Sequence, residues 1–291
     1  MTVDVSVHTL ELALAAFEQI RTPARITGAL RSDGLGAFAQ AFDSMSEESR
    51  MDVQRKAIAL RDDGIGVVIF GQDDFPTALV QDGKPLMPVI FYKGNKALLY
   101  EDGVGMCGSR NVSAAGLNAA DKCGATVSSM GLTVVSGYAK GVDTATHLAA
   151  LKNGGNTVIV LAEGFDYFRI KRDFAKDFDL NRTLVLSQFA PSQTWQAHAA
   201  MARNAIIYGL SKSLLVIEAG ERGGTLAAGE GALNLGRPVF VVDFGDQTPE
   251  GNRVLLRKGA HPVRTSAQLG EALSTVPPLA PQITSEPPAL F

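Results

Sequence analysis

Three short glycine-containing segments carry residue types that could bind a phosphate group. They are residues 108–110 (Gly-Ser-Arg), residues 136–141 (Ser-Gly-Tyr-Ala-Lys-Gly) and residues 223–225 (Gly-Gly-Thr). Glycine lets a ligand approach the backbone, amides at the start of a helix favour anions, and arginine or lysine adds positive charge. We therefore expect a phosphate-containing ligand here. The candidate contacts are Gly108, Ser109, Arg110, Ser136, Gly137, Lys140, Gly141, Gly224 and Thr225.

Four polar residues near these segments allow both a structural and a functional interpretation. Asp143 is placed to cap the helix that follows the second segment, which is its structural role. His147 lies one turn later on the same helical face, so a core position and a pocket position are equally compatible with it. Arg203 and Asn204 lie inside a predicted helix, where they either face solvent or point into the ligand crevice.

The sequence contains no recognisable catalytic or metal-binding motif. HExxH, GxSxG, a Walker phosphate loop and Cys/His metal spacings are missing, and Cys107 and Cys123 are too few for a disulfide framework. Residues 108–110 are not a full GxGxxG, and no acidic residue follows about 20 positions later to hold a ribose. We therefore expect no enzyme activity, no metal and no cofactor.

A basic segment interleaved with aromatic residues lies at residues 165–176 and includes Tyr167, Phe168 and Lys171. Positive charges suit phosphates and aromatic rings suit stacked bases, a combination typical of proteins that bind single-stranded nucleic acid. A solvated loop explains the same composition equally well, because runs of charge usually face water.

Apolar runs that alternate with helical segments predict the scaffold that positions these residues. The runs at residues 104–107 and 132–135, with a crossover helix over residues 113–130, form a β–α–β unit whose glycine loops follow its strands. Open parallel sheets bind ligands at those strand ends. Further strands are expected at residues 65–70, 88–92, 157–161, 183–187, 213–217, 238–242 and 260–263, and helices at residues 197–208, 225–235 and 252–258. The pattern predicts an α/β fold with a doubly wound, mostly parallel, extended Rossmann-like sheet.

The predicted domain organisation has three parts. Residues 1–62 show helical periodicity, and Ser44 with Glu47 resembles a capping box for a helix over residues 46–61, so we expect a small helical N-terminal domain. Residues 63–275 contain the strands of the Rossmann-like domain. Residues 276–291 are rich in proline and are expected to be disordered.

Composition limits the class of protein. The chain has 291 residues, of which 46% are hydrophobic, and a formal net charge of −3. This charge argues against a broad nucleic-acid-coating surface and leaves room for a local basic pocket. No signal peptide and no apolar run of about 20 residues is visible. We therefore expect a cytoplasmic protein that does not contact a membrane.

Seven segments in order resemble the DprA/Smf family of DNA-processing proteins. They are FYKGN (91–95), GSR (108–110), VVSGYAKGVDTATHLAAL (134–151), GGNTVIVLAEGFD (154–166), RNAIIYGLS (203–211), VIEAGERGGTLAAGEGALNLGRPVFVV (216–242) and GNRVLLRKGA (251–260). The resemblance extends over about residues 64–263. No winged-helix pattern follows Val263, which indicates a diverged member.

The resemblance implies an extended Rossmann domain that binds and protects single-stranded DNA and helps to load a RecA-type recombinase during transformation. It further implies a homodimer without catalytic activity. Carried over to this chain, the phosphate contacts would come from residues 108–110 and from Ser136, Gly137 and Lys140. Asp143, Arg203, Asn204 and Glu218 would shape the pocket. The family's Tyr-Pro after Gly-x-Asp is absent, so Tyr167, Phe168 and Lys171 match its DNA contacts only approximately.

Two other functions remain open on the sequence. Residues 223–225 with Glu230 are faintly similar to the PGGxGTxxE signature of LOG-type nucleoside-monophosphate hydrolases, although the proline is missing and the spacing to the glutamate differs. The other alternative is a nucleotide-sensing or protein-binding relative, including one used in defence, that has lost affinity for DNA. Such a protein would be stabilised by a free nucleotide and not by an oligonucleotide.

Overall fold

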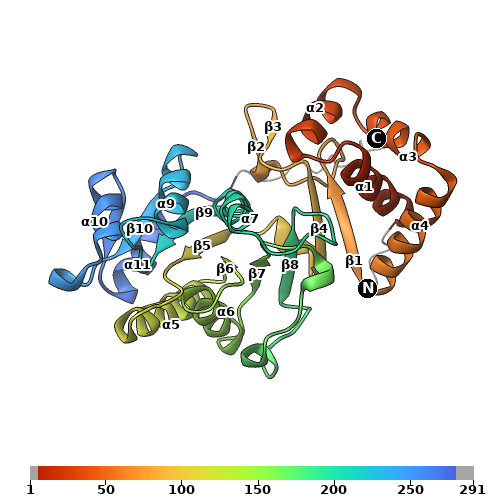
Figure 1. Ribbon diagram of the computed structural model, residues 1–291. Coiled ribbons are helices and arrows are strands. Elements are labelled where there is room, and N and C mark those ends of the chain that lie inside the picture. The colour runs from red at the N-terminus through yellow and green to blue at the C-terminus, as the bar shows by residue number, and fades with distance from the viewer. Residues whose placement is uncertain (1–5, 280–291) are drawn as a thin grey trace, which may run out of the picture.

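The computed structural model describes residues 6–279 as an α/β fold built on one large sheet (Figure 1). In this described part, nine strands are ordered β1-β4-β8-β7-β6-β5-β9-β10-β11. Their bounds are β1 Ile65–Ile69, β4 Val89–Gly94, β5 Gly103–Cys107, β6 Thr133–Gly137, β7 Thr157–Val160, β8 Thr183–Ser187, β9 Ser211–Val216, β10 Val239–Val242 and β11 His261–Val263. Strands β2 (Val80–Gln81) and β3 (Lys84–Pro85) form a separate small hairpin.

The sheet is mostly parallel, which confirms the predicted fold class. Only β4 runs antiparallel to its neighbours, β1 and β8. All other neighbouring strands, from β8 to β11, are parallel. From β5 the chain adds β6, β7 and β8 on one side and then β9, β10 and β11 on the other, so the strand order switches between β5 and β9. Open sheets form a ligand crevice at such a switch point.

Side chains alternate between the two faces of the sheet, so each strand of the large sheet except β11 contributes to two hydrophobic clusters. In β5 and β6, Met106 and Val134 pack with helices α5 and α6, whereas Cys107 and Val135 face the helices of the opposite side. Burial on both faces explains why these strands are continuous apolar runs in the sequence. Because alternate side chains along each strand are apolar on opposite faces, both faces of the sheet must be covered by helices.

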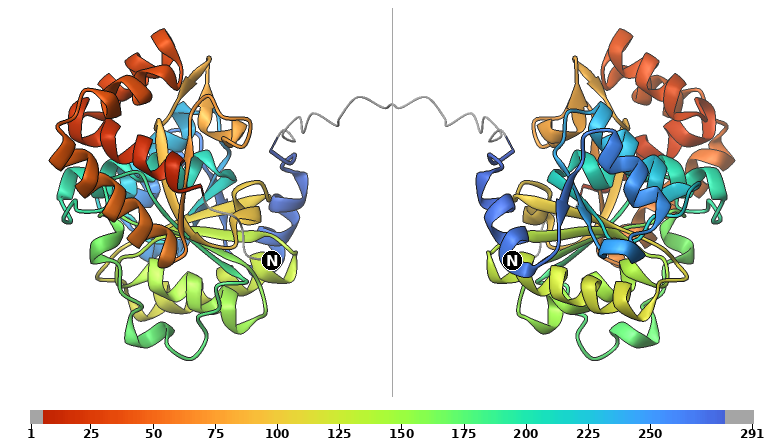
Figure 2. Two further views of the ribbon diagram at one scale, coloured as in Figure 1. Left: turned by 90° about the vertical axis from the view of Figure 1, so that its right-hand side faces the viewer. Right: turned by 90° about the vertical axis from the view of Figure 1, so that its left-hand side faces the viewer.

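Helices cover both faces of the sheet, as the two side views of Figure 2 show. Helices α5 (Ala114–Ser129), α6 (Val142–Lys152) and α11 (Ser266–Thr275) contribute to one hydrophobic cluster. Helices α8 (Asn204–Gly209), α9 (Gly224–Asn234) and α10 (Glu250–Arg257) contribute to the other. Helix α7 (Ala197–Ala202) precedes α8 and contacts both α8 and α9.

The N-terminal helices occupy residues 7–62, and Figures 1 and 2 show them beside β1. They are α1 (Val7–Gln19), α2 (Pro23–Asp33), α3 (Gly36–Asp43) and α4 (Glu47–Asp62). Their apolar residues share a cluster with β1, β4 and β8, and the ring centres of Phe17 and Phe91 lie 6.0 Å apart. The helical content matches the sequence prediction, and the division into separate domains stays a prediction.

Some predictions about helix caps and helix bounds were wrong, and one prediction concerns residues that the structure mostly does not describe. Ser46, not Ser44, caps α4, because the Ser46 hydroxyl accepts a hydrogen bond from the Ser49 amide at 3.2 Å. The helix predicted over residues 197–208 is divided into α7 and α8 at Arg203, and α11 was not predicted. The proposed disordered tail lies largely outside the described residues. Within them, no helix is both long and apolar enough to cross a membrane.

Candidate functional site

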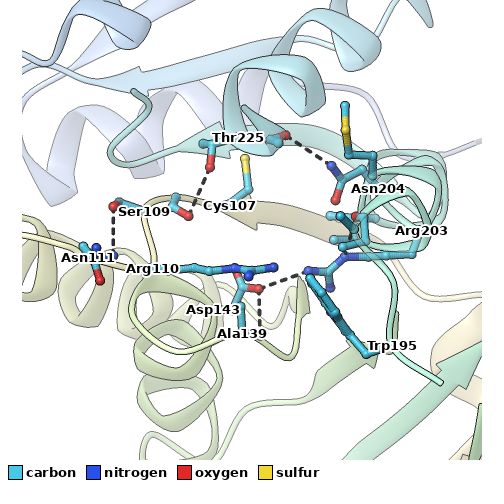
Figure 3. Close-up of a pocket in the computed structure, with 16 residues that line it drawn as sticks. Cys107, Ser109, Arg110, Asn111, Ala139, Asp143, Trp195, Arg203, Asn204 and Thr225 are labelled. Carbon is cyan, nitrogen blue, oxygen red and sulfur yellow. Dashed lines mark hydrogen bonds and ion pairs between the residues drawn. The ribbon is translucent and has the colours of Figure 1, made fainter. Parts of the chain in front are cut away.

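A cavity of about 440 Å³ opens at the carboxyl ends of β5 and β9 (Figure 3). Because β6, β5 and β9 are adjacent and parallel, the three glycine segments that follow them meet at this edge. The lining residues are Cys107, Gly108, Ser109, Arg110, Asn111, Ala139, Asp143, Trp195, Ala197, Ala200, Met201, Arg203, Asn204, Ile207, Gly224 and Thr225. Several residues named in the sequence analysis thus lie together at this edge, and their role as ligand contacts stays a prediction.

A second, smaller hollow of about 300 Å³ shares part of this lining. Its residues are Arg110, Tyr138, Ala139, Lys140, Ala162, Glu163, Trp195 and Arg203. Four of these, Arg110, Ala139, Trp195 and Arg203, also line the larger cavity. The two spaces are therefore neighbours, and we call them together the groove.

The loop after β5 is held by one hydrogen bond to the third glycine segment and by one hydrogen bond within the loop. The Thr225 hydroxyl donates to the Gly108 carbonyl at 3.1 Å, and the Asn111 amide donates to the Ser109 hydroxyl at 3.1 Å. A Cβ at residue 108 would lie 2.4 Å from Val142 Cγ2, so glycine is required there by the packing of α6. These bonds leave Ser109 and Arg110 at the opening of the groove, where Figure 3 shows them.

Glu218 holds the start of α5 rather than lining the groove. Its Oε2 accepts a hydrogen bond from the Ser113 amide at 3.0 Å, and its Oε1 accepts one from the Ser113 hydroxyl. Ser113 is the N-cap of α5. The Cβ of any residue larger than glycine at position 116 would lie 2.4 Å from Glu218 Oε1. Glu218 therefore fixes the end of the loop after β5 from outside the groove, through its bonds to Ser113.

Two exposed cations, Arg110 and Lys140, stand at the groove. The Arg110 guanidinium lies 5.5 Å from the centre of the Trp195 ring, a cation–π arrangement. Neither cation forms an ion pair with any described carboxylate. Both charges are therefore available to an anionic ligand, and their role as phosphate contacts stays a prediction.

Arg203 lines both hollows and also orders the loops around them, and its role as a phosphate contact stays a prediction. It is 7% exposed, and its Nη1 donates to the Val160 carbonyl at 2.7 Å. Its Nη2 lies 3.4 Å from Asp143 Oδ2, and Asp143 is 6% exposed. The same carboxylate oxygen accepts a hydrogen bond from the Ala139 amide at 3.1 Å. This buried pair joins α6, the α7–α8 junction and the loop after β6.

Asp143 is not the N-cap of its helix, contrary to the capping interpretation. Helix α6 begins at Val142, and Gly141 with φ of 83° occupies the cap position. A Cβ at residue 141 would lie 2.4 Å from the Ser109 carbonyl oxygen. Gly141 therefore brings the first two loops together, and any side chain at this position would collide with the loop after β5.

Ser136 and Gly137 are also directed into the protein, which corrects their prediction as phosphate contacts. Ser136 is fully buried, and its hydroxyl donates to the Met106 carbonyl at 2.7 Å. A Cβ at residue 137 would lie 1.7 Å from Arg203 Nη1. Glycine is needed at this position so that the arginine can pack against the backbone.

His147 is a core histidine, so the pocket interpretation is wrong. It is fully buried, with Nδ1 2.6 Å from Thr157 Oγ1 and Nε2 2.7 Å from the Gly137 carbonyl oxygen. Burial lowers the pKa of its imidazole to about 4. The neutral ring supports the strand from which the second loop departs.

The third segment leaves space for a ligand. A Cβ at Gly224 would meet no heavy atom within 4 Å, and α9 has no side-chain cap. Asn204 Nδ2 donates to the Gly224 carbonyl at 3.2 Å and so fixes this loop (Figure 3). The uncapped amides at the start of α9 suit an anion. Gly224, Thr225 and Asn204 remain candidate contacts.

The basic aromatic segment lies beside the groove and does not line it. Lys171 Nζ donates to the Tyr138 carbonyl at 2.5 Å and lies 4.0 Å from the centre of the Tyr138 ring. Burial lowers the pKa of this lysine. Phe168 packs on Tyr138 with ring centres 5.6 Å apart, whereas Tyr167 is 49% exposed. Lys171 is thus engaged within the protein, contrary to its prediction as a DNA contact.

Among the groove residues that the sequence analysis did not name as site residues are Trp195, Met201 and Glu163. Trp195 and Met201 are 50% and 51% exposed. Their loop and helix carry no glycine or charge motif, and the one usable signal is that the single tryptophan of the chain lies in a polar segment.

The remaining polar clusters do not suggest another chemistry. Glu230, the glutamate of the hydrolase alternative, pairs with Lys258 at 2.6 Å and does not line the groove. Among the described residues, no group of His, Cys, Asp and Glu has an arrangement that could hold a metal ion. Cys107 and Cys123 are buried free thiols, and burial raises the pKa of Cys123 to about 12.

Comparison with known proteins identifies the family. The sequence model described as DNA recombination-mediator protein A matches residues 66–274. The chain belongs to this family. A DNA processing protein DprA from Streptococcus pneumoniae is 39% identical over 183 residues, which are 62% of this chain and 64% of that protein. The family resemblance of the sequence is therefore confirmed.

Two solved structures support the fold of this recombination-mediator family member. The X-ray structure of DprA from S. pneumoniae matches with a TM-score of 0.69 and 27% identity, covering 95% of this chain and 99% of that one. A DprA from Helicobacter pylori, whose structure concerns its single-stranded DNA binding mode, matches with a TM-score of 0.62 and 20% identity. That match covers 72% of this chain and 95% of the other.

Proposed function

We propose that the protein binds single-stranded DNA in the groove and acts as a DNA recombination mediator. In this role it would protect the strand and help to load a RecA-type recombinase, as a homodimer. The family membership supports the recombination setting, and the H. pylori relative is described as binding single-stranded DNA. The proposal is a binding role in the cytoplasm, without a catalytic step.

The observation that carries this proposal is the pair of unpaired cations at a groove built by three loops. Arg110 and Lys140 stand beside the exposed ring of Trp195, and the uncapped start of α9 lies across the larger cavity. A strand of single-stranded DNA needs cationic groups along its phosphates and flat surfaces for its bases. The groove offers both.

The domain organisation completes the proposal. Residues 63–275 would form the DNA-binding unit and residues 1–62 a helical unit packed on the antiparallel end of its sheet, with residues 276–291 as a tail. Lys56 of α4 pairs with Asp166 at 2.5 Å, in the segment that follows β7. The N-terminal helices would therefore help to hold the segment that lies beside the groove.

The test is a titration of labelled oligothymidylate followed by fluorescence anisotropy at several salt concentrations. Arg110→Ala and Lys140→Ala are each expected to weaken binding roughly tenfold, because each removes a charge-assisted phosphate contact. Each variant should also reduce the slope of log K against log salt by about one. Lys84→Ala, an exposed lysine on the β2–β3 hairpin, is the matched control and should bind like wild type.

If both groove variants bind like wild type, the DNA site is elsewhere. Incubation with nucleoside monophosphates provides a separate check. Steady release of free base would replace this proposal with the hydrolase alternative. A rise in melting temperature with a free nucleotide, and none with an oligonucleotide, would replace it with nucleotide sensing.

A further inference from the structure

Trp195 presents an open aromatic face within the proposed DNA groove. Its side chain is 50% exposed and lines both hollows, although tryptophan normally buries most of its large apolar surface. Arg110 lies on the ring at 5.5 Å and can exchange this contact for a phosphate. An exposed indole beside cations is the arrangement on which an unpaired base stacks.

Glu163 places a carboxylate in the smaller hollow, together with Trp195, Arg110 and Lys140. It is half-buried, and it forms no ion pair with any described cation. Burial raises the pKa of its carboxyl, while Arg203 and Lys171 oppose that rise. A carboxylate repels phosphate, so its presence here calls for a ligand group that donates hydrogen bonds.

Among the four bases, guanine fits a carboxylate best. Its N1–H and N2–H₂ donors are adjacent and can pair with both carboxylate oxygens, as a guanidinium does. Adenine and cytosine offer an amino group next to a ring-nitrogen acceptor. Thymine offers one N–H between two carbonyl acceptors, which a carboxylate repels. These edges are accessible only on an unpaired base, because in a duplex they face the partner strand.

We propose that the smaller hollow binds one unpaired guanine of a DNA strand, stacked on Trp195 and hydrogen-bonded to the Glu163 carboxylate. Arg110 and Lys140 at its rim pair with the flanking phosphates. This inference rests on the proposed single-stranded DNA binding and adds a base preference to it. The larger cavity, lined by Ser109, Asn204 and Thr225, then accepts the continuing backbone of the strand.

The experiment uses oligothymidylates of about twelve nucleotides with and without one central guanine, since guanine homopolymers fold on themselves. Binding is followed by anisotropy and by quenching of Trp195, the only tryptophan of the chain. The guanine probe is expected to bind about five- to tenfold more tightly than the all-thymine probe. It should also quench the tryptophan more strongly.

Two variants separate the roles of the carboxylate and the ring. Glu163→Gln should abolish the preference for guanine and bind the all-thymine probe at least as well as wild type, because a negative charge is removed. Glu271→Gln, an exposed glutamate on α11, is the charge-matched control and should keep the preference. Trp195→Ala should weaken both probes about tenfold, and Trp195→Phe should retain most of the affinity.

Equal binding of the two probes by wild type, or a preference that survives Glu163→Gln, would overturn the inference and leave the proposed function intact. Absence of binding by every probe at low salt would overturn both. A preference that disappears in EDTA would assign Glu163 to a metal ion instead. Free dGMP that competes as well as the guanine strand would make this a free-nucleotide site and exclude the strand.

Discussion

Glycines at the groove have opposite surroundings although the sequence makes them look alike. A Cβ at Gly137 would meet the Arg203 guanidinium and a Cβ at Gly141 would meet the Ser109 carbonyl, so at both positions protein occupies the space of a side chain. Gly224 borders open space at the larger cavity. A glycine motif therefore predicts a close approach of some group, and only the folded chain tells whether that group is protein or ligand.

Gly137→Ala is expected to destabilise the protein by about 2–4 kcal/mol. The new Cβ would lie 1.7 Å from Arg203 Nη1, so the guanidinium would have to leave Asp143 and the Val160 carbonyl. Breaking a buried ion pair costs energy on this scale. Equilibrium unfolding in urea measures the change.

Gly224→Ala is the matched control, because its Cβ would meet no neighbour and alanine suits a helix start. Its free energy of unfolding should stay within about 0.5 kcal/mol of wild type. Equal stabilities of the two variants would contradict the assigned role of Gly137.

The type of a basic residue does not tell whether its charge is paired within the folded protein. Arg110, Lys140 and Arg203 were predicted as phosphate contacts and Lys171 as an approximate DNA contact. In the structure Arg110 lies on the Trp195 ring, and neither Arg110 nor Lys140 has an ion pair with a described carboxylate. Arg203 and Lys171 are instead engaged by protein groups. Asp143 lies far from Arg203 in sequence, and Tyr138 lies far from Lys171. Such pairings arise from the fold, so no local pattern reveals them.

Strands were predicted best where every residue is buried, because such strands are continuous apolar runs in the sequence. The apolar runs of the sheet matched because each is buried on both faces. The break between α7 and α8 was missed, because Arg203 keeps helical backbone angles at the junction and no glycine or proline marks it in the sequence. Helix α11 was missed because Leu269 and Leu273 are its only buried apolar residues.

At the scale of elements, Glu218 couples the end of β9 to the start of α5. Glu218→Ala would remove both acceptors of Ser113 and is expected to destabilise the protein by about 1–2 kcal/mol. The amides of residues 109–113 should exchange hydrogen faster, because the loop loses its support. Hydrogen exchange with peptide-level mass spectrometry measures this.

Glu221→Ala provides the control for that experiment. Glu221 is exposed, follows the same strand, and forms no hydrogen bond or ion pair in the described structure. Its exchange pattern should equal that of wild type. Faster exchange at residues 109–113 in this variant would show that general surface charge, not the Glu218 contact, holds the loop.

At the scale of the whole molecule, His147 should make stability depend on pH. Its pKa is about 4 in the folded state, below its ordinary value of 6.5, because the ring is buried. Between these values the unfolded chain binds a proton that the folded chain does not. The free energy of unfolding should therefore decrease as pH falls through this window, by up to about 1.4 kcal/mol per pH unit.

Urea unfolding at several pH values between about 4 and 7 tests this dependence. His147→Gln should flatten the dependence, even though it lowers the stability at neutral pH. His261→Gln, at an exposed histidine, should keep the wild-type slope. A slope unchanged in His147→Gln would assign the acid sensitivity to other groups.

The last strand of the sheet has a consequence for self-association. Strand β11 has three residues, and its central residue, Pro262, has no amide hydrogen to donate. Short edge strands that contain proline resist the addition of a strand from another molecule. Two copies of this chain would therefore not extend one continuous intermolecular sheet through β11, and the proposed homodimer should bury a different surface.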